Sequence, residues 1–259
     1  MGYRHPERRS ALSLPIFRSD LHVHTVLSPC AEIEMIPSLI VEEALAKGIQ
    51  LIAITDHNAS YNVSAVIKAS ENSGLIVLPG MEIQTKEEVH VLCLFDNINQ
   101  LEKFQVIVNK HLPPLKNKED YFGYQLVVDE SGNLIRTEEQ LLLTSTNLSI
   151  DQIWGIVEEL NGIIIPAHVN RKVNGLIEIL GFVPEEIPII ALEVSRHITP
   201  EKAKIQFPQI NTYPVIQNGD VHRLSEFLGS TYFSMKEPTI KEIKLALQGK
   251  EGRSFQVLA

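Results

Sequence analysis

Residues 50–58 read QLIAITDHN, a mostly apolar run that passes directly into an aspartate and a histidine. Such a run is typical of a strand buried on both faces, and similar runs occur at 75–78 (LIVL) and 163–167 (IIIPA). Between the strands lie helical patterns such as 37–47 (PSLIVEEALAK), which has proline in its first turn and is followed by Gly48. This alternation predicts an α/β protein with a parallel sheet.

The same alternation extends through most of the chain. The predicted strands cover residues 20–25, 50–55, 75–78, 89–95, 163–167, 191–194 and 215–216, and two further helices are predicted at 224–228 and 239–247. Six or seven strand–helix units in this length suit either a closed barrel or an open doubly wound sheet.

The stretch from about 97 to 151 departs from this rhythm. It is more polar, and residues 124–135 predict a β-hairpin around a Ser-Gly-Asn turn. We expect an insertion or lid carried by a single domain that spans residues 1–259. Its aromatic residues either pack on the scaffold or form a pocket wall that stacks a nucleic-acid base; the candidates are Tyr121, Phe122, Tyr124 and the nearby His111.

Composition narrows the class of protein. The chain has 259 residues, 44% of them hydrophobic, so a disordered polypeptide is excluded. A formal net charge of −9 argues against binding nucleic acid mainly by neutralising phosphates. Two cysteines, Cys30 and Cys93, are too few for a disulfide-stapled scaffold. With neither a signal-peptide core nor a membrane-spanning run in the sequence, we expect a soluble, cytoplasmic protein. The sequence carries no signal for a particular oligomeric state.

Histidines and carboxylates recur at the predicted strands. His22 and His24 lie two residues apart on an extended segment, so their side chains share one face. The other members of the set are Asp56, His57, Glu82, His90, His168, Asp220 and His222. Single strand-end polar groups often only cap strands, but chance does not explain titratable groups at five separate strands.

In parallel α/β folds, the carboxyl ends of the strands form one rim, and ligands bind there. A set of this size exceeds what one cation needs. We therefore expect two or three divalent ions, with a carboxylate such as Glu82 or Asp220 forming a bridge.

These residues resemble the motifs of the PHP (polymerase and histidinol phosphatase) family. The first motif is similar to Asp20–Thr25 and the second to Ile54–Asn58; the third resembles Gly80-Met81-Glu82 with His90, and the fourth His168 followed by Gly219–His222. The resemblance covers most of residues 18–233. It implies a distorted seven-stranded β/α (TIM-like) barrel with a trinuclear zinc, manganese or iron site and phosphoesterase activity.

The resemblance also implies a ligand set. His22, His24, Glu82 and Asp220 would hold the first ion, and Glu82 would bridge to a second ion held by His90 and His168. His57 and His222 would hold the third, with Asp56 as a further ligand or an orienting partner. Where the family often has another histidine or an aspartate, this chain has Cys30, which either binds the third ion as a thiolate or is a small buried thiol. Cys93 is expected in the core.

Three arginines follow predicted strands close to these ligands: Arg171, Arg196 and Arg223. Each alone fits a surface salt bridge, but together they predict a phosphate pocket, because the guanidinium fork suits phosphate oxygens. Bound cations would lower the pKa of water so that hydroxide can attack phosphorus at neutral pH. The expected catalytic residues are Asp56, Asp220 and His222.

The first hypothesis is therefore a metal-dependent phosphohydrolase acting on a small phosphomonoester, such as histidinol phosphate, or on a nucleotide or oligonucleotide phosphate. A second is an amidohydrolase-like enzyme acting on a C–N or C–O bond, which would expect a metal-bridging lysine. The third is a non-catalytic module stabilised by its metals.

Overall fold

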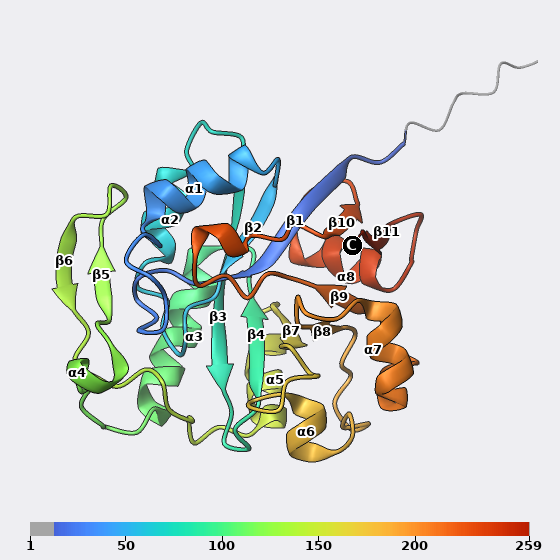
Figure 1. Ribbon diagram of the computed structural model, residues 1–259. Helices are drawn as coiled ribbons and strands as arrows, with labels where there is room; N and C mark the ends of the chain where they lie inside the picture. The colour runs from blue at the N-terminus through green and yellow to red at the C-terminus, as the bar shows by residue number, and fades with distance from the viewer. Residues whose placement is uncertain (1–12, 259) are drawn as a thin grey trace, which may run out of the picture.

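The computed structural model describes residues 13–258 (Figure 1). The elements follow in chain order: β1 (Ile16–Val23), α1 (Pro37–Ala46), β2 (Leu51–Ile54), α2 (Val63–Ala69), β3 (Ile76–Gln84), β4 (His90–Leu94), α3 (Ile98–His111), α4 (Glu119–Phe122), β5 (Leu126–Val128), β6 (Leu134–Thr137), α5 (Ile150–Glu159), β7 (Ile163–Pro166), α6 (Leu176–Leu180), β8 (Leu192–Val194), α7 (Pro200–Gln206), the short 3-10 helix η1 (Pro208–Ile210), β9 (Val215–Gln217), the 3-10 helix η2 (Leu224–Glu226), β10 (Thr231–Ser234), α8 (Ile240–Leu247) and β11 (Ser254–Val257). The predicted α/β class is confirmed.

The strands form a distorted barrel. Seven of them make one sheet in the order β11-β10-β1-β2-β3-β4-β7, while β8 and β9 form a separate parallel pair. Beside β7, the amide of Val169 donates to the carbonyl of Glu193 (2.8 Å), and beyond β9 an isolated bridge joins Val221 to Val23 at the end of β1. The ring β1-β2-β3-β4-β7-β8-β9 is thereby closed, which confirms the predicted seven-stranded barrel, and β10 and β11 extend it outside β1.

The direction of β4 corrects the expectation of a parallel sheet. β4 pairs antiparallel with both β3 and β7, since β3 and β4 are joined by a short turn without a crossover helix. An apolar run such as 89–95 shows that a strand is buried but not which way it runs. The consequence for function is that His90, the first residue of β4, lies opposite Gln84 at the end of β3.

Two apolar layers hold the barrel together. Alternate residues of one strand belong to different clusters: Leu51 and Ala53 face one, Ile52 and Ile54 the other, as the two-residue period of a strand requires. The cluster of Leu51 also contains the apolar face of α8, whereas the other cluster packs beneath the helices α1, α2, α3 and α5. Both clusters are built from buried side chains, with partly buried apolar residues packed against them.

The stretch 97–151 contains the two helices α3 and α4 and one β-hairpin. Its first part is α3, which buries Leu101, Phe104 and Val108 against β3. Then come the four-residue helix α4 and the predicted hairpin, formed by β5 and β6 at one side of the molecule (Figure 1). The backbone amide of Leu126 donates to the carbonyl of Val26, so the hairpin is attached to the loop after β1.

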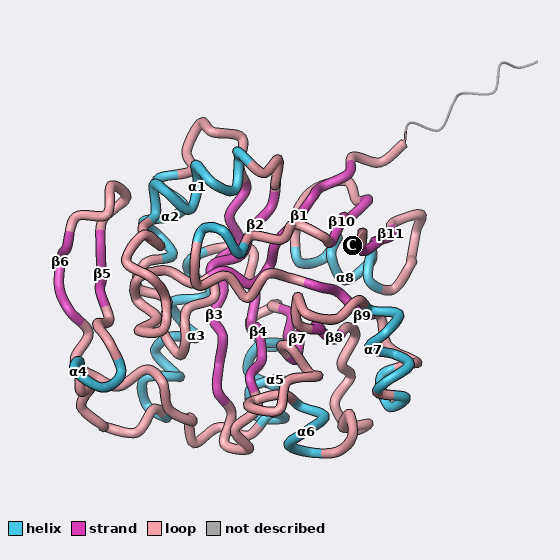
Figure 2. The backbone as a smooth tube through the Cα atoms, in the orientation of Figure 1, coloured by secondary structure: helices cyan, strands magenta, loops and turns pink. Residues whose placement is uncertain are grey.

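The helix predicted at 224–228 is a single 3-10 turn, η2, within a longer loop. Figure 2 shows how much of the chain between the short strands consists of such loops. In residues 13–258, no helix combines the length and the apolar character needed to cross a bilayer.

Candidate metal centre

Glu82 lies at the centre of the histidine cluster. Along β3 the inward-facing positions run from Leu78 through Gly80 to Glu82, and along β4 they run from Leu92 back to His90. Because β4 is antiparallel, Glu82 and His90 reach the same rim, and His90 Nδ1 lies 2.9 Å from Glu82 Oε1.

Four further histidines approach the same carboxylate. His168 Nε2 lies 3.1 Å and His22 Nε2 3.3 Å from Oε1, while His57 Nδ1 lies 2.9 Å and His24 Nε2 3.4 Å from Oε2. All of these side chains are buried. Residues in or just after β1, β2, β3, β4 and β7 therefore converge as the sequence predicted, although His22 and His168 are 146 positions apart in the chain.

Asp220 and His222 complete the cluster from the loop after β9. Asp220 Oδ1 lies 3.3 Å from His22 Nε2 and 3.5 Å from His24 Nε2. The Asp220 backbone is left-handed (φ 49°), which turns its side chain toward the β1 histidines. The rings of His222 and His24 stack with centroids 4.0 Å apart.

Metal ions fit this donor set. Three groups of donor atoms are each close enough to hold one ion: His22, His24 and Asp220; His57, Glu82 and His90; and His24, His57 and His222. Among the described residues, the buried Glu82 Oε2 accepts no well-aligned hydrogen bond, although His57 Nδ1 lies 2.9 Å away. A buried carboxylate oxygen without a hydrogen bond is costly in a folded protein, and this one is free to bind a cation. Imidazole and carboxylate are the ligands that zinc, manganese and iron accept.

The ligand histidines are held by partners that fix which ring nitrogen is free. Asp56 accepts hydrogen bonds from the Thr25 amide (2.7 Å), the Thr25 hydroxyl (2.8 Å) and the Ser28 hydroxyl (2.7 Å). Because the Ser28 hydroxyl donates to Asp56, its oxygen is free to accept from His24 Nδ1 (2.9 Å). The Nε2 lone pair of His24 therefore points at the cluster.

Glu193 does the same for His22. Its carboxylate lies 3.0 Å and 3.2 Å from His22 Nδ1 and also accepts from the His168 amide and from the side chain of Asn218. Sequence reasoning assigned no role to Glu193. The available signal was a charged residue inside the apolar run 191–194, which β8 buries completely.

Asp20 is a second residue that sequence reasoning left without a role. Its buried carboxylate accepts from the backbone amides of Gly219, Leu228 and Gly229, and so holds the turn that carries Asp220. Burial raises the pKa of Asp20 to about 6, although these three amides lower it.

The charges of the cluster balance one another. Burial would raise the pKa of Glu82, but His90, His22 and His57 outweigh it and hold that pKa well below the usual range. Burial alone would lower the pKa of His22, but Glu193, Glu82 and Asp220 raise it well above 6.5. His24 behaves oppositely, because burial and the neighbouring His222 and His57 hold its pKa well below 6.5.

Cys30 lies beside the third histidine group. Desolvation raises the pKa of its thiol, but the charge of His57 and hydrogen bonds with His222 and His57 lower it to about 6. The thiol is therefore largely a thiolate at neutral pH in this environment. Cys93, by contrast, is fully buried in β4, as expected for a core residue.

The three predicted arginines line one cleft of about 460 Å³ next to the cluster, together with Cys30, Asp220 and His222. Each is also paired with a carboxylate: Arg171 with Asp220 (2.7 Å), Arg196 with Glu226 (2.6 Å) and Arg223 with Glu32 (3.0 Å). Each of these arginines therefore forms a salt bridge and also lines the cleft.

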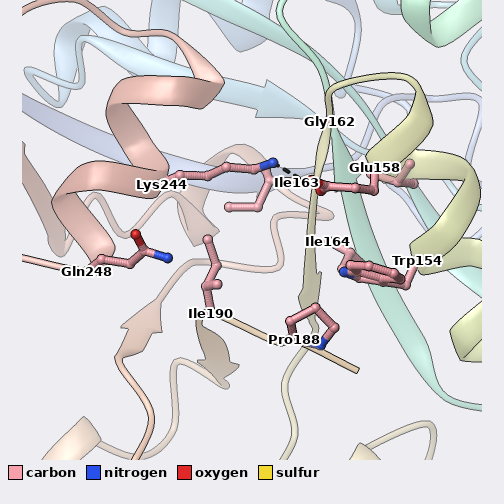
Figure 3. Close-up of a pocket in the computed structure, with 10 residues that line it drawn as sticks. Trp154, Glu158, Gly162, Ile163, Ile164, Pro188, Ile190, Lys244 and Gln248 are labelled. Carbon is pink, nitrogen blue, oxygen red and sulfur yellow. Dashed lines mark hydrogen bonds and ion pairs between the residues drawn. The ribbon is translucent and has the colours of Figure 1, made fainter. Parts of the chain in front are cut away.

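A separate, smaller hollow of about 180 Å³ lies between α5 and α8 (Figure 3). Trp154 and Ile190 are among its walls, and Lys244 pairs with Glu158 across it at 3.3 Å. Its lining contains none of the candidate ligands, so the metal chemistry belongs to the cleft beside Asp220.

Metal binding should release protons. The pKa of His57, like that of His22, is raised well above 6.5: burial lowers it, but Cys30 and Glu82 outweigh this. Both imidazoles are therefore protonated at neutral pH without metal, and a cation must displace their protons. We therefore expect metal binding to release protons and the affinity to fall as the pH drops. Calorimetric titration with zinc in buffers of different ionisation enthalpy measures this; binding without proton release contradicts it.

Glu193→Gln should weaken metal binding. The amide keeps the size of the side chain but removes the charge that supports the His22 imidazole, so we expect roughly 10- to 100-fold lower zinc affinity. Competition with a chromophoric chelator measures the affinity, and circular dichroism checks the fold. Glu185→Gln, at an exposed glutamate, is the matched control. Equal affinity in the Glu193 variant and the control would show that Glu193 does not support the ligand.

Comparisons with known proteins agree with this geometry. Residues 20–179 match the PHP domain. The lesion-specific endonuclease Q of Pyrococcus furiosus is 21% identical (TM-score 0.69), and an endonuclease Q complex with a 27-mer duplex that has an abasic lesion at the active site is 22% identical (TM-score 0.67). Each likeness covers 93% of this chain but only 58% of the endonuclease chain.

A proposed metal-dependent phosphoesterase from Bifidobacterium adolescentis is 17% identical, with a TM-score of 0.54 over 85% of this chain and 89% of that one. These structural likenesses show the fold. No curated protein sequence matches the chain. The PHP match spans more than half of the sequence and includes His22, His24, His57, Glu82, His90 and His168, all within the cluster. The chain therefore belongs to the PHP domain family.

Proposed function

We propose that this chain hydrolyses a phosphomonoester, either of a small metabolite or of a nucleotide, with two or three divalent ions at the Glu82 cluster. The observation that carries the proposal is the contact between cluster and cleft: Asp220 presents Oδ1 to the β1 histidines and Oδ2 to Arg171. One carboxylate thus joins a site for cations to a site for anions. The endonuclease Q complex, whose 27-mer duplex substrate has an abasic lesion at the active site, supports a phosphate ester as the substrate.

The ligand sets follow the three groups of donor atoms. One ion would be held by His22, His24 and Asp220, and a second by Glu82 and His90, with His57 or His168 beside it. The third would lie between His57 and His222, nearest the cleft. When bound, such ions lower the pKa of water and neutralise phosphate oxygens.

The protein's own groups then bind and orient the substrate. Arg171, Arg196 and Arg223 line the cleft and can exchange their carboxylate partners for phosphate oxygens, because the guanidinium fork fits either anion. Asp56 acts through Ser28 on His24, so we assign it a positioning role. His222 donates from Nδ1 to the Asp220 carbonyl (3.0 Å), which leaves Nε2 free to face the cluster.

The two alternatives expected from the sequence gain less support. An amidohydrolase-like centre would have a lysine as the bridging ligand, whereas a glutamate occupies the middle of this cluster. A purely structural metal site would not need a cleft with three arginines beside it.

Phosphate release from a panel of phosphorylated metabolites and nucleotides, with added manganese or zinc, tests the proposal. Asp220→Asn should lower the rate roughly 100-fold or more while circular dichroism shows an intact fold, because it removes a ligand charge. Asp151→Asn, at an exposed aspartate, is the control. Metal-loaded protein that turns over no phosphate ester, or that hydrolyses only cyclic amides or esters, contradicts the proposal.

Cys30 should bind the third ion as a thiolate and so favour zinc or iron over manganese. Protein loaded with cobalt(II) should then show thiolate-to-cobalt charge-transfer absorption in the near ultraviolet, and Cys30→Ser should lose it. Cys93→Ala is the matched control, because Cys93 is the other cysteine of the chain. A band that persists in the Cys30 variant, or is absent from the native protein, would remove Cys30 from the ligand set.

A further inference from the structure

Three aromatic residues near α4 form what we call the aromatic platform: Tyr121, Phe122 and Tyr124. Tyr121 is 80% exposed and Tyr124 60% exposed, whereas Phe95, Phe104 and Phe233 are fully buried. The Tyr121 and Phe122 rings meet edge to face with centroids 4.7 Å apart. The alternative in which all these aromatic residues pack on the scaffold is therefore wrong for the two tyrosines.

Hydrogen bonds anchor the backbone that carries the platform. Asn117 Nδ2 donates to the Gly123 carbonyl (2.9 Å). The fully buried Gln125 donates to the carbonyls of Glu138 and Gln140 and accepts from the Leu142 amide. Because this backbone is anchored and a tyrosine side chain has only two rotatable torsions, the platform loses little conformational entropy when a planar ligand stacks on it.

The platform adjoins the substrate cleft through one short loop. Gly123 has φ 96°, and a Cβ there would lie 2.5 Å from the Pro29 carbonyl oxygen, so the two backbones are in direct contact. The next residue, Cys30, lines the cleft. Two residues further on, the Glu32 amide donates to the His222 carbonyl (2.9 Å) and the Glu32 side chain pairs with Arg223. Residues 29–32 therefore contact both the platform and the cleft.

Charge separates the two neighbouring surfaces. The hollow beside Tyr121 is lined by two lysines, Lys116 and Lys118, and by four acidic residues, Glu119, Asp120, Glu138 and Glu139. Its net charge is therefore negative, which disfavours phosphate there. The cleft carries the three arginines. A ligand that occupies both must present an uncharged planar group to the tyrosines and a phosphate to the arginines and the cluster.

We propose that the aromatic platform stacks a base of a single-stranded oligonucleotide whose terminal phosphate lies in the cleft. This inference rests on the proposed phosphoesterase function and specifies its substrate class. Stacking on aromatic side chains tolerates any base, so the platform selects nucleic acid over a small phosphorylated metabolite without selecting a sequence. The bond that is cleaved remains the terminal phosphate ester, with water as the acceptor.

Oligonucleotide binding and small-substrate turnover test this separately. The probes are short single strands with a 5′- or a 3′-terminal phosphate and the fluorescent base 2-aminopurine near that end, titrated with metal-loaded protein under conditions of no turnover. We expect quenching for at least one probe, and roughly tenfold weaker binding in the double variant Tyr121→Ala/Tyr124→Ala, since base stacking on an aromatic residue contributes about that much or more. Hydrolysis of p-nitrophenyl phosphate should stay unchanged.

The control is Phe182→Ala, at a phenylalanine that is 56% exposed just after α6, which Figure 1 places away from α4. Unchanged oligonucleotide affinity in the double variant, or no binding by the native protein, overturns the inference. An equal loss of p-nitrophenyl phosphate turnover also overturns it, because the tyrosines would then support the site itself. If the platform instead joins two copies of the chain, the molecular mass in solution will rise with protein concentration, and this rise will be absent from the double variant. That result also overturns the inference. If the probes bind as expected but no phosphate ester is hydrolysed, the platform stands and the proposed function fails.

Discussion

The structure depends on the buried carboxylate of Glu82. Its two oxygens lie within 3.4 Å of nitrogen atoms of five histidines. Two negatively charged oxygens cannot satisfy five imidazoles in a low-dielectric interior unless several of those rings carry protons or the cluster holds cations. The raised pKa values of His22 and His57 and the lowered pKa of Glu82 correspond to the first possibility, in which protonated rings surround an ionised carboxylate. Divalent ions are the second, and three groups of donor atoms in the cluster are each close enough to hold one.

The strand directions in the barrel make this convergence possible. Reversal of β4 brings His90 to the rim from the start of a strand, whereas Glu82 approaches along β3 in the opposite direction. A surrounding layer then sets the ring tautomers: Ser28 and Asp56 act on His24, and Glu193 acts on His22. Because these partners come from the loops after β1 and β2 and from strand β8, the ligand geometry is an outcome of the whole fold and not of one motif.

Much of this could be predicted from the sequence, since the chemistry-bearing residues stand at recognisable strand ends. His22 and His24 alternate on one strand, and His57 follows an unmistakable buried run. Strand direction could not be predicted, because the β4 run is equally apolar in either orientation. Strands β10 and β11 were missed, because short mixed segments such as TYFS and SFQV carry little periodic signal. Glu193 was missed because its role depends on contacts with residues 171 positions away.

Elemental analysis of the metal content tests the central claim most directly. Protein equilibrated with zinc or manganese and then freed of unbound ions should retain two or three ions per chain. Glu82→Gln should retain fewer, since the carboxylate shared by the histidines is gone while the side-chain volume is kept. A native chain that retains no ion, or a Glu82 variant that retains as many as the native chain, would contradict the account.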